Sequence, residues 1–180
     1  MSLSKWKKIS ETVLFKNPWW IYKKDETILP NGKPGEYHYV HTNGASMVVP
    51  ILDDGRVVLV RQYRYLNDRL SLEFPCGGVK DGHTYEETAK LELAEEAGYT
   101  TRNLQAVGAF NPYNGVTDEI CKVFTAKDLL AVQSIPDETE EFEKVFLTKN
   151  EVDADIASGV IWDGMTIAAW MIVKIKSFVK

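Results

Sequence analysis

The chain has 180 residues, 44% of them hydrophobic, which suits one globular domain that needs no disulfide or structural metal. Its formal net charge of −5 argues against an electrostatic nucleic-acid binder, which normally carries a basic face. The longest strongly apolar stretch, residues 167–175, is about half the length of a membrane span. Two cysteines outside any CxxC pair, and a start without a signal-peptide core, favour a cytoplasmic protein that works on a small molecule and binds no membrane.

Short strands and turns are predicted for the first 80 residues. The β-prone or extended segments are 19–22, 37–41, 45–52, 56–63 and 72–75. Turn residues separate them, above all the hairpin pattern Asp53-Asp54-Gly55 and the proline- and glycine-rich residues 29–35. The last of these segments leads into a predicted loop, Cys76-Gly77-Gly78.

One helix stands out in the middle of the chain. Thr84 and Glu87 form a capping box and Gly98 is a natural helix stop, so we expect a helix over 85–97. A second capping box, Thr148 with Glu151, opens a short helix toward Gly159. The remaining elements are strands over 104–110, 120–125 and 142–147 and a last helix from 163 or 164 to about 178. This order favours a mixed α/β or α+β fold over a regular βαβ array.

Three glutamates on the mid-chain helix carry the strongest chemical pattern. Glu92, Glu95 and Glu96 fall within an arc of about 100°, so their like charges repel one another. No lysine or arginine lies three or four residues away to offset them. A divalent cation would relieve the repulsion, and oxygen ligands suit Mg²⁺ or Mn²⁺. The alternative is a solvated helix face; the neighbouring Gly77 and Gly78, which let backbone approach a metal or anion closely, weigh against it.

The residues around these glutamates keep a fixed spacing, with five residues between Gly77 and His83 and seven between His83 and Leu91. The spacing resembles the box of the Nudix family, G-x5-E-x7-R-E-U-x-E-E-x-G-U, where U is a bulky apolar residue. The matching positions are Gly77, Glu92, Leu93, Glu95, Glu96, Gly98 and Tyr99. The resemblance implies an enzyme that hydrolyses a nucleoside diphosphate linked to another moiety, with Mg²⁺ or Mn²⁺ on the box glutamates.

The resemblance extends over most of the chain, to the ADP-ribose and nucleotide-sugar pyrophosphatase branch of the family. Residues 57–64 (VVLVRQYR), residues 72–77 (LEFPCG) and a downstream acidic loop look like that branch. The resemblance implies a Nudix-type α/β/α sandwich with a mixed sheet over residues 45–180. It also implies a small antiparallel β-subdomain over residues 1–44, which this branch exchanges between the subunits of a homodimer.

The same resemblance gives roles to the residues of a metal site. Glu92 and Glu96 are the implied principal ligands, and Glu95 is a ligand or a water-orienting group. The backbone carbonyl of Cys76 would complete the shell, so the family's alanine can be replaced there without loss. Glu73 matches a position close to the metals in this branch.

A base that takes the proton of the attacking water is expected in the acidic loop at 137–143. Glu138 is the first choice and Glu141 the second, because a glutamate of this loop serves as base in the related branch. The alternative is a solvated acidic loop, since loops of this composition are common.

Substrate contacts are expected from two further sets of residues. Arg64 follows a predicted strand and aligns with a phosphate-contacting arginine of the branch, and Arg61 lies close before it; the alternative is a strand-end salt bridge. Glu119 matches a recurrent acidic position in a loop that faces the substrate. Trp19 and Trp20 could stack on the base, across the dimer, although aromatic residues in short strands more often serve packing.

Two positions depart from the box. Leu91 cannot make the ion pairs of the family's arginine, and His83 removes a carboxylate from the loop side. If these two positions interact in the family, their joint loss avoids an unpaired buried charge. We therefore expect metal binding to survive, with slower turnover or an altered preference for metal or pH.

The expected substrate is a small nucleotide, and the protein is expected to bind no nucleic acid. ADP-ribose, cleaved to AMP and ribose 5-phosphate, is the leading candidate. GDP-mannose, another nucleotide sugar and a dinucleoside polyphosphate are alternatives. Two hypotheses of other classes stay open: a Nudix-fold module that binds a nucleotide without cleaving it, and a structural dimer whose glutamates form a solvated face.

Overall fold

The computed structural model describes residues 3–134 and 141–178. The chain divides into two compact units. One, here called the N-terminal unit, comprises Met1–Asn43 and Asn111–Glu119. The other, the main unit, comprises Gly44–Phe110 and Ile120–Lys180. Each unit is described by itself.

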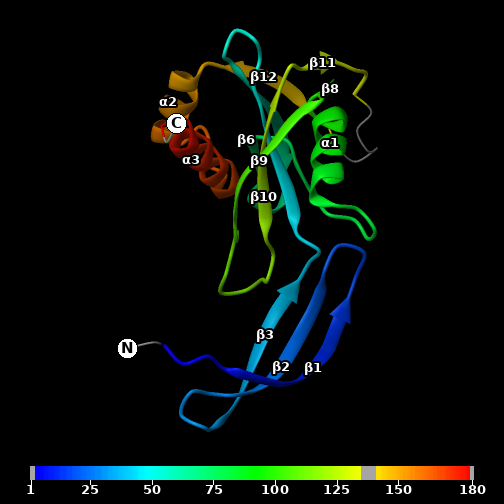
Figure 1. Ribbon diagram of the computed structural model, residues 1–180, viewed down its shortest axis with the longest axis vertical. Helices are drawn as coiled ribbons and strands as arrows, with labels where there is room; N and C mark the ends of the chain where they lie inside the picture. The colour runs from blue at the N-terminus through cyan, green and yellow to red at the C-terminus, as the bar shows by residue number, and fades with distance from the viewer. Residues whose placement is uncertain (1–2, 135–140, 179–180) are drawn as a thin grey trace. The chain divides into compact units, whose positions relative to one another are not determined.

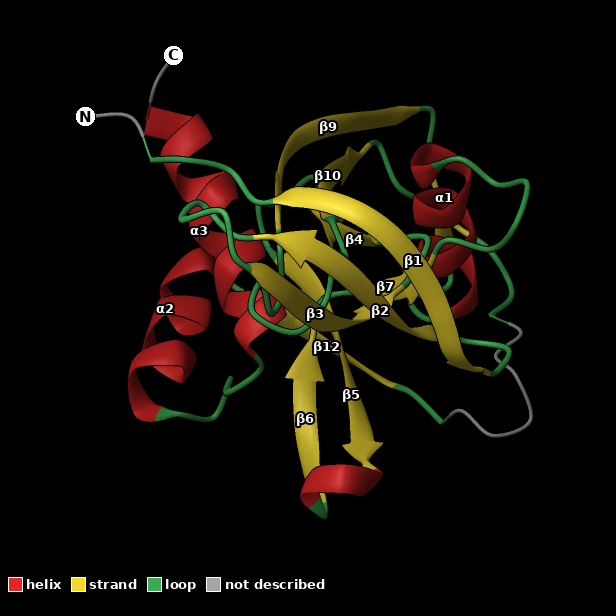
Figure 2. Ribbon diagram, turned by 90° about the horizontal axis from the view of Figure 1, so that it is seen from below, coloured by secondary structure: helices red, strands yellow, loops and turns green. Residues whose placement is uncertain are grey.

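The N-terminal unit is an antiparallel sheet of three strands, which Figure 2 shows lying side by side in the order β1-β2-β3. The strands are β1 (Lys7–Lys16), β2 (Ile21–Ile28) and β3 (Pro34–His41). The predicted turn between β2 and β3 is present, since the Leu29 amide donates to the Lys33 carbonyl at 2.8 Å. The segment 111–119 is tied to β3, where the Val40 amide donates to the Val116 carbonyl at 2.9 Å.

The strand β1 was not predicted from the sequence. Its sequence, KKISETVLFK, does not alternate apolar and polar residues, and all ten residues are exposed. Its backbone pairs with β2 from Lys7 opposite Ile28 to Lys16 opposite Ile21. This strand is therefore held by backbone hydrogen bonds and surface contacts, which leave little trace in a hydrophobicity pattern.

The main unit contains a mixed four-stranded sheet of order β7-β4-β10-β9, in which β4 and β10 run parallel. A three-stranded sheet, β12-β5-β6, and a two-stranded pair, β11-β8, complete it. The strands are β4 (Ala45–Pro50), β5 (Val57–Arg64), β6 (Arg69–Glu73), β7 (Cys76–Gly78), β8 (Tyr99–Thr100), β9 (Asn103–Phe110), β10 (Cys121–Lys127), β11 (Leu130–Ala131) and β12 (Glu143–Leu147).

Three helices cover the sheets of the main unit. They are α1 (Tyr85–Glu95), α2 (Lys149–Ser158) and α3 (Gly164–Phe178). In Figure 1, α1 lies on one side of the sheet, and α2 and α3 lie on the other. Both predicted capping boxes are present, at Thr84 and at Thr148. The α/β class and the α/β/α layering expected from the sequence are confirmed. Within the described ranges, no helix is long and apolar enough to span a membrane.

Two hydrophobic clusters fill the spaces on either side of the sheet, and β4 contributes to both by alternation. Val48 points to the cluster beneath α1, which also contains Leu93. Met47 and Val49 point to the cluster beneath α3, which also contains Trp170. Because successive side chains of a strand face opposite sides, one central strand anchors both layers.

The segment Cys76–Gly78, predicted as a loop, is instead the short strand β7. Cys76 pairs with Met47 of β4, and Gly77 pairs with Ser46. Glycine is rare in strands, so the sequence did not predict a strand here. The segment is nevertheless a strand because it pairs with the edge of β4. This edge position brings the backbone of Cys76 and Gly77 beneath α1.

Candidate active site

Helix α1 is anchored at its first turn. The Glu87 amide donates to Thr84 Oγ1 at 3.2 Å, and the Thr84 amide donates to Glu87 Oε2 at 2.8 Å. The hydrogen bond from the Thr84 amide lowers the pKa of the Glu87 carboxyl group. The helix buries Ala89 and Leu93 in the cluster beneath it. This fixed start and buried face determine which way the box glutamates point.

Glu96 lies at the end of α1 and is buried, with 6% of its surface exposed. The backbone amide of Cys76 donates to Glu96 Oε2 at 3.0 Å. A hydrogen bond from a backbone amide to a carboxylate favours the ionised form, so it helps to hold this charge in a buried place. The structure thus brings together Cys76 and Glu96, two residues that the sequence assigned to one metal shell.

Glu92, which is half-buried, rests against Gly77 of β7. A Cβ atom added to Gly77 would lie 2.0 Å from Glu92 Oε1, whereas one added to Gly78 would meet nothing within 4 Å. The backbone of Gly77 does not have a positive φ angle, so glycine is required there for space rather than for conformation. Gly77 therefore lets the backbone of β7 approach the Glu92 carboxylate closely.

Glu95 is half-buried on the same helix. Its backbone carbonyl accepts a hydrogen bond from the hydroxyl of Ser134. This contact ties the last turn of α1 to the segment that follows β11. Among residues 3–134 and 141–178, no further contact assigns a task to the Glu95 side chain.

The donor chemistry of this site suits a hard divalent cation. Carboxylates of Glu92 and Glu96 both lie against β7, and Gly77 leaves the space that a side chain would fill. Over residues 3–134 and 141–178, no three His, Cys, Asp or Glu side chains are grouped so that they could hold a metal ion. A complete shell would therefore need a further ligand, such as the Cys76 carbonyl.

Arg64 and Glu73 form a two-point ion pair. Arg64 Nε donates to Glu73 Oε1 at 2.8 Å, and Arg64 Nη2 donates to Glu73 Oε2. The Glu73 side chain is 4% exposed and that of Arg64 is 45% exposed. The Glu73 carboxylate raises the pKa of the Arg64 guanidinium group. The predicted phosphate donor and the predicted metal-proximal carboxylate are thus partners of each other, a pairing that their sequence separation did not indicate.

Arg61 makes a different kind of contact, on the surface. Its Nη1 lies 2.7 Å from Glu143 Oε2, and the two residues face each other on β5 and β12. Both side chains are exposed, so Arg61 forms a cross-strand salt bridge on the surface. The strand-end salt bridge that the sequence left as an alternative corresponds to the pair of Arg64 with Glu73. Glu141 is exposed ahead of β12, and Glu138 lies outside the described residues.

Three predicted substrate contacts belong to the N-terminal unit. Trp19 is 79% exposed and Trp20 38% exposed, and Trp20 packs on Phe15 with ring centroids 5.5 Å apart. Glu119 accepts a hydrogen bond from the Thr42 hydroxyl at 2.9 Å. Trp19 is therefore largely exposed, whereas Trp20 packs against a neighbouring ring of its own unit.

The two departures from the box are both on the surface. His83 is exposed and Leu91 is 39% exposed. Because both positions are exposed to solvent, replacing the family's glutamate by His83 and its arginine by Leu91 leaves no buried charge without a partner.

Cys121 is a neighbour of Cys76 that the sequence did not identify. The Cys121 thiol and burial together raise the pKa of Cys76 well above its ordinary value. Cys76 therefore carries a neutral thiol near neutral pH, which agrees with a role for its backbone rather than its side chain. A separation of more than forty residues gave no sign of this contact, which arises because β7 and β10 flank β4.

Comparison with known proteins agrees with this architecture. The NUDIX domain family matches residues 41–166. An ADP-ribose pyrophosphatase of Bacillus subtilis is 32% identical over 154 residues, covering 84% of this chain and 83% of the relative. A GDP-mannose pyrophosphatase of Yersinia enterocolitica is 34% identical over 153 residues, covering 79% of this chain and 78% of the relative. The chain therefore belongs to the Nudix family.

A solved structure described as an ADP compounds hydrolase superposes with a TM-score of 0.82 at 22% identity, covering 97% of this chain and 95% of that one. This likeness shows the same fold. The family match and the two relatives also confirm the prediction that the protein is an enzyme, a Nudix pyrophosphatase.

Proposed function

We propose that the protein hydrolyses the diphosphate bond of ADP-ribose, giving AMP and ribose 5-phosphate. The observation that carries the proposal is the placement of the Glu92 and Glu96 carboxylates against Cys76 and Gly77 of β7. The relative from Bacillus subtilis named ADP-ribose pyrophosphatase, which matches over most of both chains, supports the choice of substrate.

Glu92, Glu96 and the carbonyl of Cys76 would hold Mg²⁺ or Mn²⁺, with Glu95 as a further ligand or a water-orienting group. When bound, the cation offsets charge on the phosphoryl oxygens and makes a bound water more acidic. The amide of Cys76 keeps the Glu96 carboxylate in place, and Gly77 leaves room for that of Glu92. The chain thus presents two charged oxygen ligands whose positions are set before a cation arrives.

Arg64 would bind a phosphate of the substrate while Glu73 holds its orientation. Two of the five N–H donors of the guanidinium group serve Glu73, so three remain for phosphate oxygens. The exposure of Arg64 beside the buried Glu73 allows solvent, and hence a ligand, to reach those donors. A glutamate of the acidic loop, Glu138 first and Glu141 second, would take the proton from the attacking water.

In a homodimer, the N-terminal unit of one chain would contribute to the substrate site of its partner. The wholly exposed strand β1 and the exposed Trp19 support a covering partner for the N-terminal unit. In this proposal, residues 1–44 are exchanged between two chains, Trp19 and Trp20 stack on the base, and Glu119 lies in a loop that faces the substrate. The protein would act in the cytoplasm, where Cys76 and Cys121 stay reduced.

GDP-mannose is the second candidate substrate, favoured by the relative from Yersinia enterocolitica of that specificity. The deciding experiment is product analysis on a panel of nucleotide sugars with Mg²⁺ or Mn²⁺. AMP and ribose 5-phosphate from ADP-ribose, at a higher kcat/KM than for GDP-mannose, would support the first candidate. The reverse order of kcat/KM would move the assignment to GDP-mannose.

Variants test the site in the same assay. Glu96→Gln should lower kcat by about a hundredfold or more, because it removes one charged oxygen ligand of the proposed cation. Glu86→Gln is the matched control, since Glu86 lies on the same helix and pairs with Lys90 on the surface. Loss of activity in Glu96→Gln together with full activity in Glu138→Gln would keep the metal site and discard Glu138 as the base.

The non-catalytic alternative gives a different result. A binding module would hold ADP-ribose without turnover, and Glu92→Gln would leave its affinity unchanged. Absence of product across the whole panel, with either cation, would contradict hydrolysis itself.

A further inference from the structure

The start of α3 covers the outer edge of β6. This strand is the outermost of its three-stranded sheet, so the backbone groups on the side away from β5 need other partners. Trp162 Nε1 donates to the carbonyl of Leu70 at 3.0 Å. The amide of Phe74, the residue after β6, donates to Thr166 Oγ1 at 3.2 Å. Two side chains that are four residues apart therefore hold the two ends of one strand.

The contact between Phe74 and Thr166 is buried and supported from both sides. Phe74 is 1% exposed and Thr166 is 0% exposed. The Thr166 amide donates to Asp163 Oδ2 at 2.7 Å, which fixes the first turn of α3 in the manner of a helix cap. The ring of Phe74 packs on Trp170, four residues further along α3, with ring centroids 6.1 Å apart. The donor and the acceptor are therefore each held in place by other contacts as well.

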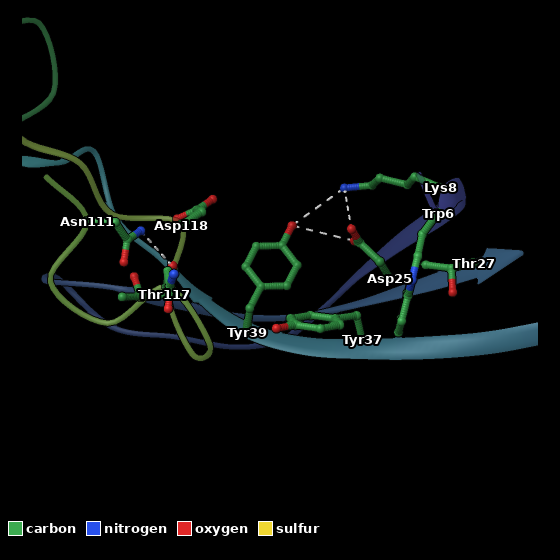
Figure 3. A pocket seen from close by; sticks show the side chains of 10 residues that line it. Trp6, Lys8, Asp25, Thr27, Tyr37, Tyr39, Asn111, Thr117 and Asp118 are labelled. Carbon is green, nitrogen blue, oxygen red and sulfur yellow. Dashed lines mark hydrogen bonds and ion pairs between the residues drawn. The ribbon is translucent and has the colours of Figure 1, made fainter. Parts of the chain in front are cut away.

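Burial distinguishes this contact from the polar contacts of the N-terminal unit. There, Lys8, Asp25 and Tyr39 bind one another beside a pocket of about 560 Å³, as Figure 3 shows. The Lys8 side chain is 48% exposed, so water can replace a contact that is lost. A lost contact at Phe74 cannot be replaced in this way, and the buried amide would be left without an acceptor.

Proline makes the Phe74 amide important for its segment. Pro75 has no N–H, so the Phe74 amide is the only backbone donor that residues 74 and 75 offer. The carbonyl of Pro75 accepts a hydrogen bond from the Val48 amide at 2.9 Å. That hydrogen bond ties the segment to β4, and the one to Thr166 ties it to α3.

Residues of the candidate active site lie on both sides of Phe74. Glu73, directly before it, is the partner of Arg64, whose Nε lies 2.8 Å from Glu73 Oε1. Cys76, two residues after it, donates its amide to Glu96 Oε2 at 3.0 Å. A shift of the Phe74 backbone would therefore disturb both contacts together.

We propose that Thr166 is a positioning residue of this pyrophosphatase. Its hydroxyl accepts the Phe74 amide and so fixes the segment 73–76. In this position the segment supplies a backbone amide for Glu96 and a carboxylate for Arg64. Thr166 contacts neither substrate nor cation and acts only through that backbone. The inference rests on the metal site of the proposed function, because the fixed segment carries part of that site.

Two substitutions at Thr166 separate this role from a purely structural one. Thr166→Val keeps a side chain of nearly the same shape but removes the acceptor, whereas Thr166→Ser keeps the acceptor but removes a buried methyl group. Both should lower the melting temperature, and only Thr166→Val should disturb the candidate active site. Thr88→Val is the matched control, because the Thr88 hydroxyl is buried on α1 and has no hydrogen-bond partner among the described residues.

The first readout is Mn²⁺ binding without substrate, followed by the loss of the EPR signal of the free ion. Thr166→Val should weaken Mn²⁺ binding about tenfold, the lower end of the effect of removing a group that supports metal ligands. The second readout is kcat for ADP-ribose at saturating Mn²⁺, which should fall about tenfold in the same variant. Thr166→Ser and Thr88→Val should match the wild type in both readouts. Circular dichroism at the assay temperature checks that each variant is folded.

Wild-type Mn²⁺ affinity and kcat in folded Thr166→Val would overturn the proposal. Equal losses in Thr166→Val and Thr166→Ser would overturn it as well, because they would assign the effect to packing rather than to the hydrogen bond. If Thr166→Val does not fold, Thr166→Cys replaces it, since a thiol is a weaker acceptor. It should weaken Mn²⁺ binding in the same direction, and wild-type affinity in that variant would again overturn the proposal.

The wild-type protein separates a failure at Thr166 from a failure of the proposed function. A wild type that binds Mn²⁺ and cleaves ADP-ribose, together with an unaffected Thr166→Val, refutes only the role of Thr166. A wild type that binds no Mn²⁺ refutes the proposed metal site itself, and with it the role of Thr166.

Discussion

The two units of the molecule handle their apolar side chains in opposite ways. In the main unit, Val48 and Leu93 are wholly buried beneath α1, and Met47 and Val49 are almost wholly buried on the other face. In the N-terminal unit, every residue of β1 is exposed. Exposed apolar residues of that strand are Ile9, Val13, Leu14 and Phe15. The main unit is stabilised by a buried core, whereas β1 of the N-terminal unit leaves its apolar side chains exposed to solvent.

Ion pairs near the surface, rather than a buried core, link the side chains of β1 and β2 in the N-terminal unit. Lys8 and Lys23 both contact Glu11, and these contacts lower the pKa of Glu11 from 4.5 to about 2. Surface pairs of this kind contribute little to the free energy of unfolding. The comparison therefore indicates that the N-terminal unit gains stability when something covers β1, as the proposed dimer would.

The largest expected effect contrasts a leucine from each unit. Leu93→Ala should lower the free energy of unfolding by about 2–5 kcal/mol, because it empties a fully buried position of the cluster beneath α1. Leu14→Ala, at a site that is 46% exposed, should change it by about 0.5 kcal/mol or less in the monomer. Urea unfolding at low protein concentration measures both. Equal losses would show that β1 is part of a core, against the comparison.

The second contrast concerns two arginines of β5. Arg64→Met leaves the Glu73 carboxylate buried and without its partner, so it should lower the free energy of unfolding by about 2–3 kcal/mol. Arg61→Met removes only an exposed pair with Glu143 and should change it by about 0.5 kcal/mol or less. Both are measured by urea unfolding at neutral pH. A small effect in both variants would contradict the view that Arg64 is the partner on which the buried Glu73 depends.

The third contrast separates two adjacent glycines of β7. Gly77→Ala places a methyl group where the Glu92 carboxylate lies, so that carboxylate must move. Activity on ADP-ribose should fall about tenfold or more, in line with the loss of a positioned ligand. Gly78→Ala meets nothing within 4 Å and should keep most of the activity. Steady-state kinetics over a series of Mg²⁺ concentrations tests this, and equal activity of the two variants would refute the role of Gly77.

The smallest expected effect is a pH dependence in the N-terminal unit. Since folding lowers the pKa of Glu11 from 4.5 to about 2, its contribution is complete above pH 4.5 and is lost as the pH falls toward 2. The melting temperature of Glu11→Gln should therefore lie below that of the wild type at neutral pH. The difference should shrink as the pH falls below about 4. A difference that is constant down to pH about 2 would contradict this account.

Sequence patterns predicted the parts of the fold that rest on local chemistry. The capping boxes at Thr84 and Thr148 set the starts of α1 and α2, and Gly98 and Gly159 follow these helices with positive φ angles. The strands of the main unit carried apolar residues that the two core layers require. The strand β1 lacked this pattern, and all ten of its residues are exposed.

The sequence predicted the candidate metal ligands of the site, but it did not predict the contacts that surround them. The spacing of the box identified Glu92 and Glu96, because a helix fixes which of its residues share a face. The pairing of Arg64 with Glu73 depends on the β5–β6 hairpin, and the contact of Cys76 with Glu96 depends on the pairing of β7 with β4. Contacts that depend on tertiary pairing leave no local pattern in a single sequence.

The most direct test of the central claim is a crystal structure of the protein soaked in Mn²⁺, with anomalous diffraction recorded at the manganese edge. The account predicts a peak between the carboxylates of Glu92 and Glu96, next to β7, which weakens or disappears in Glu96→Gln. An anomalous map without a peak at this place, in crystals of the active wild-type enzyme, would contradict it.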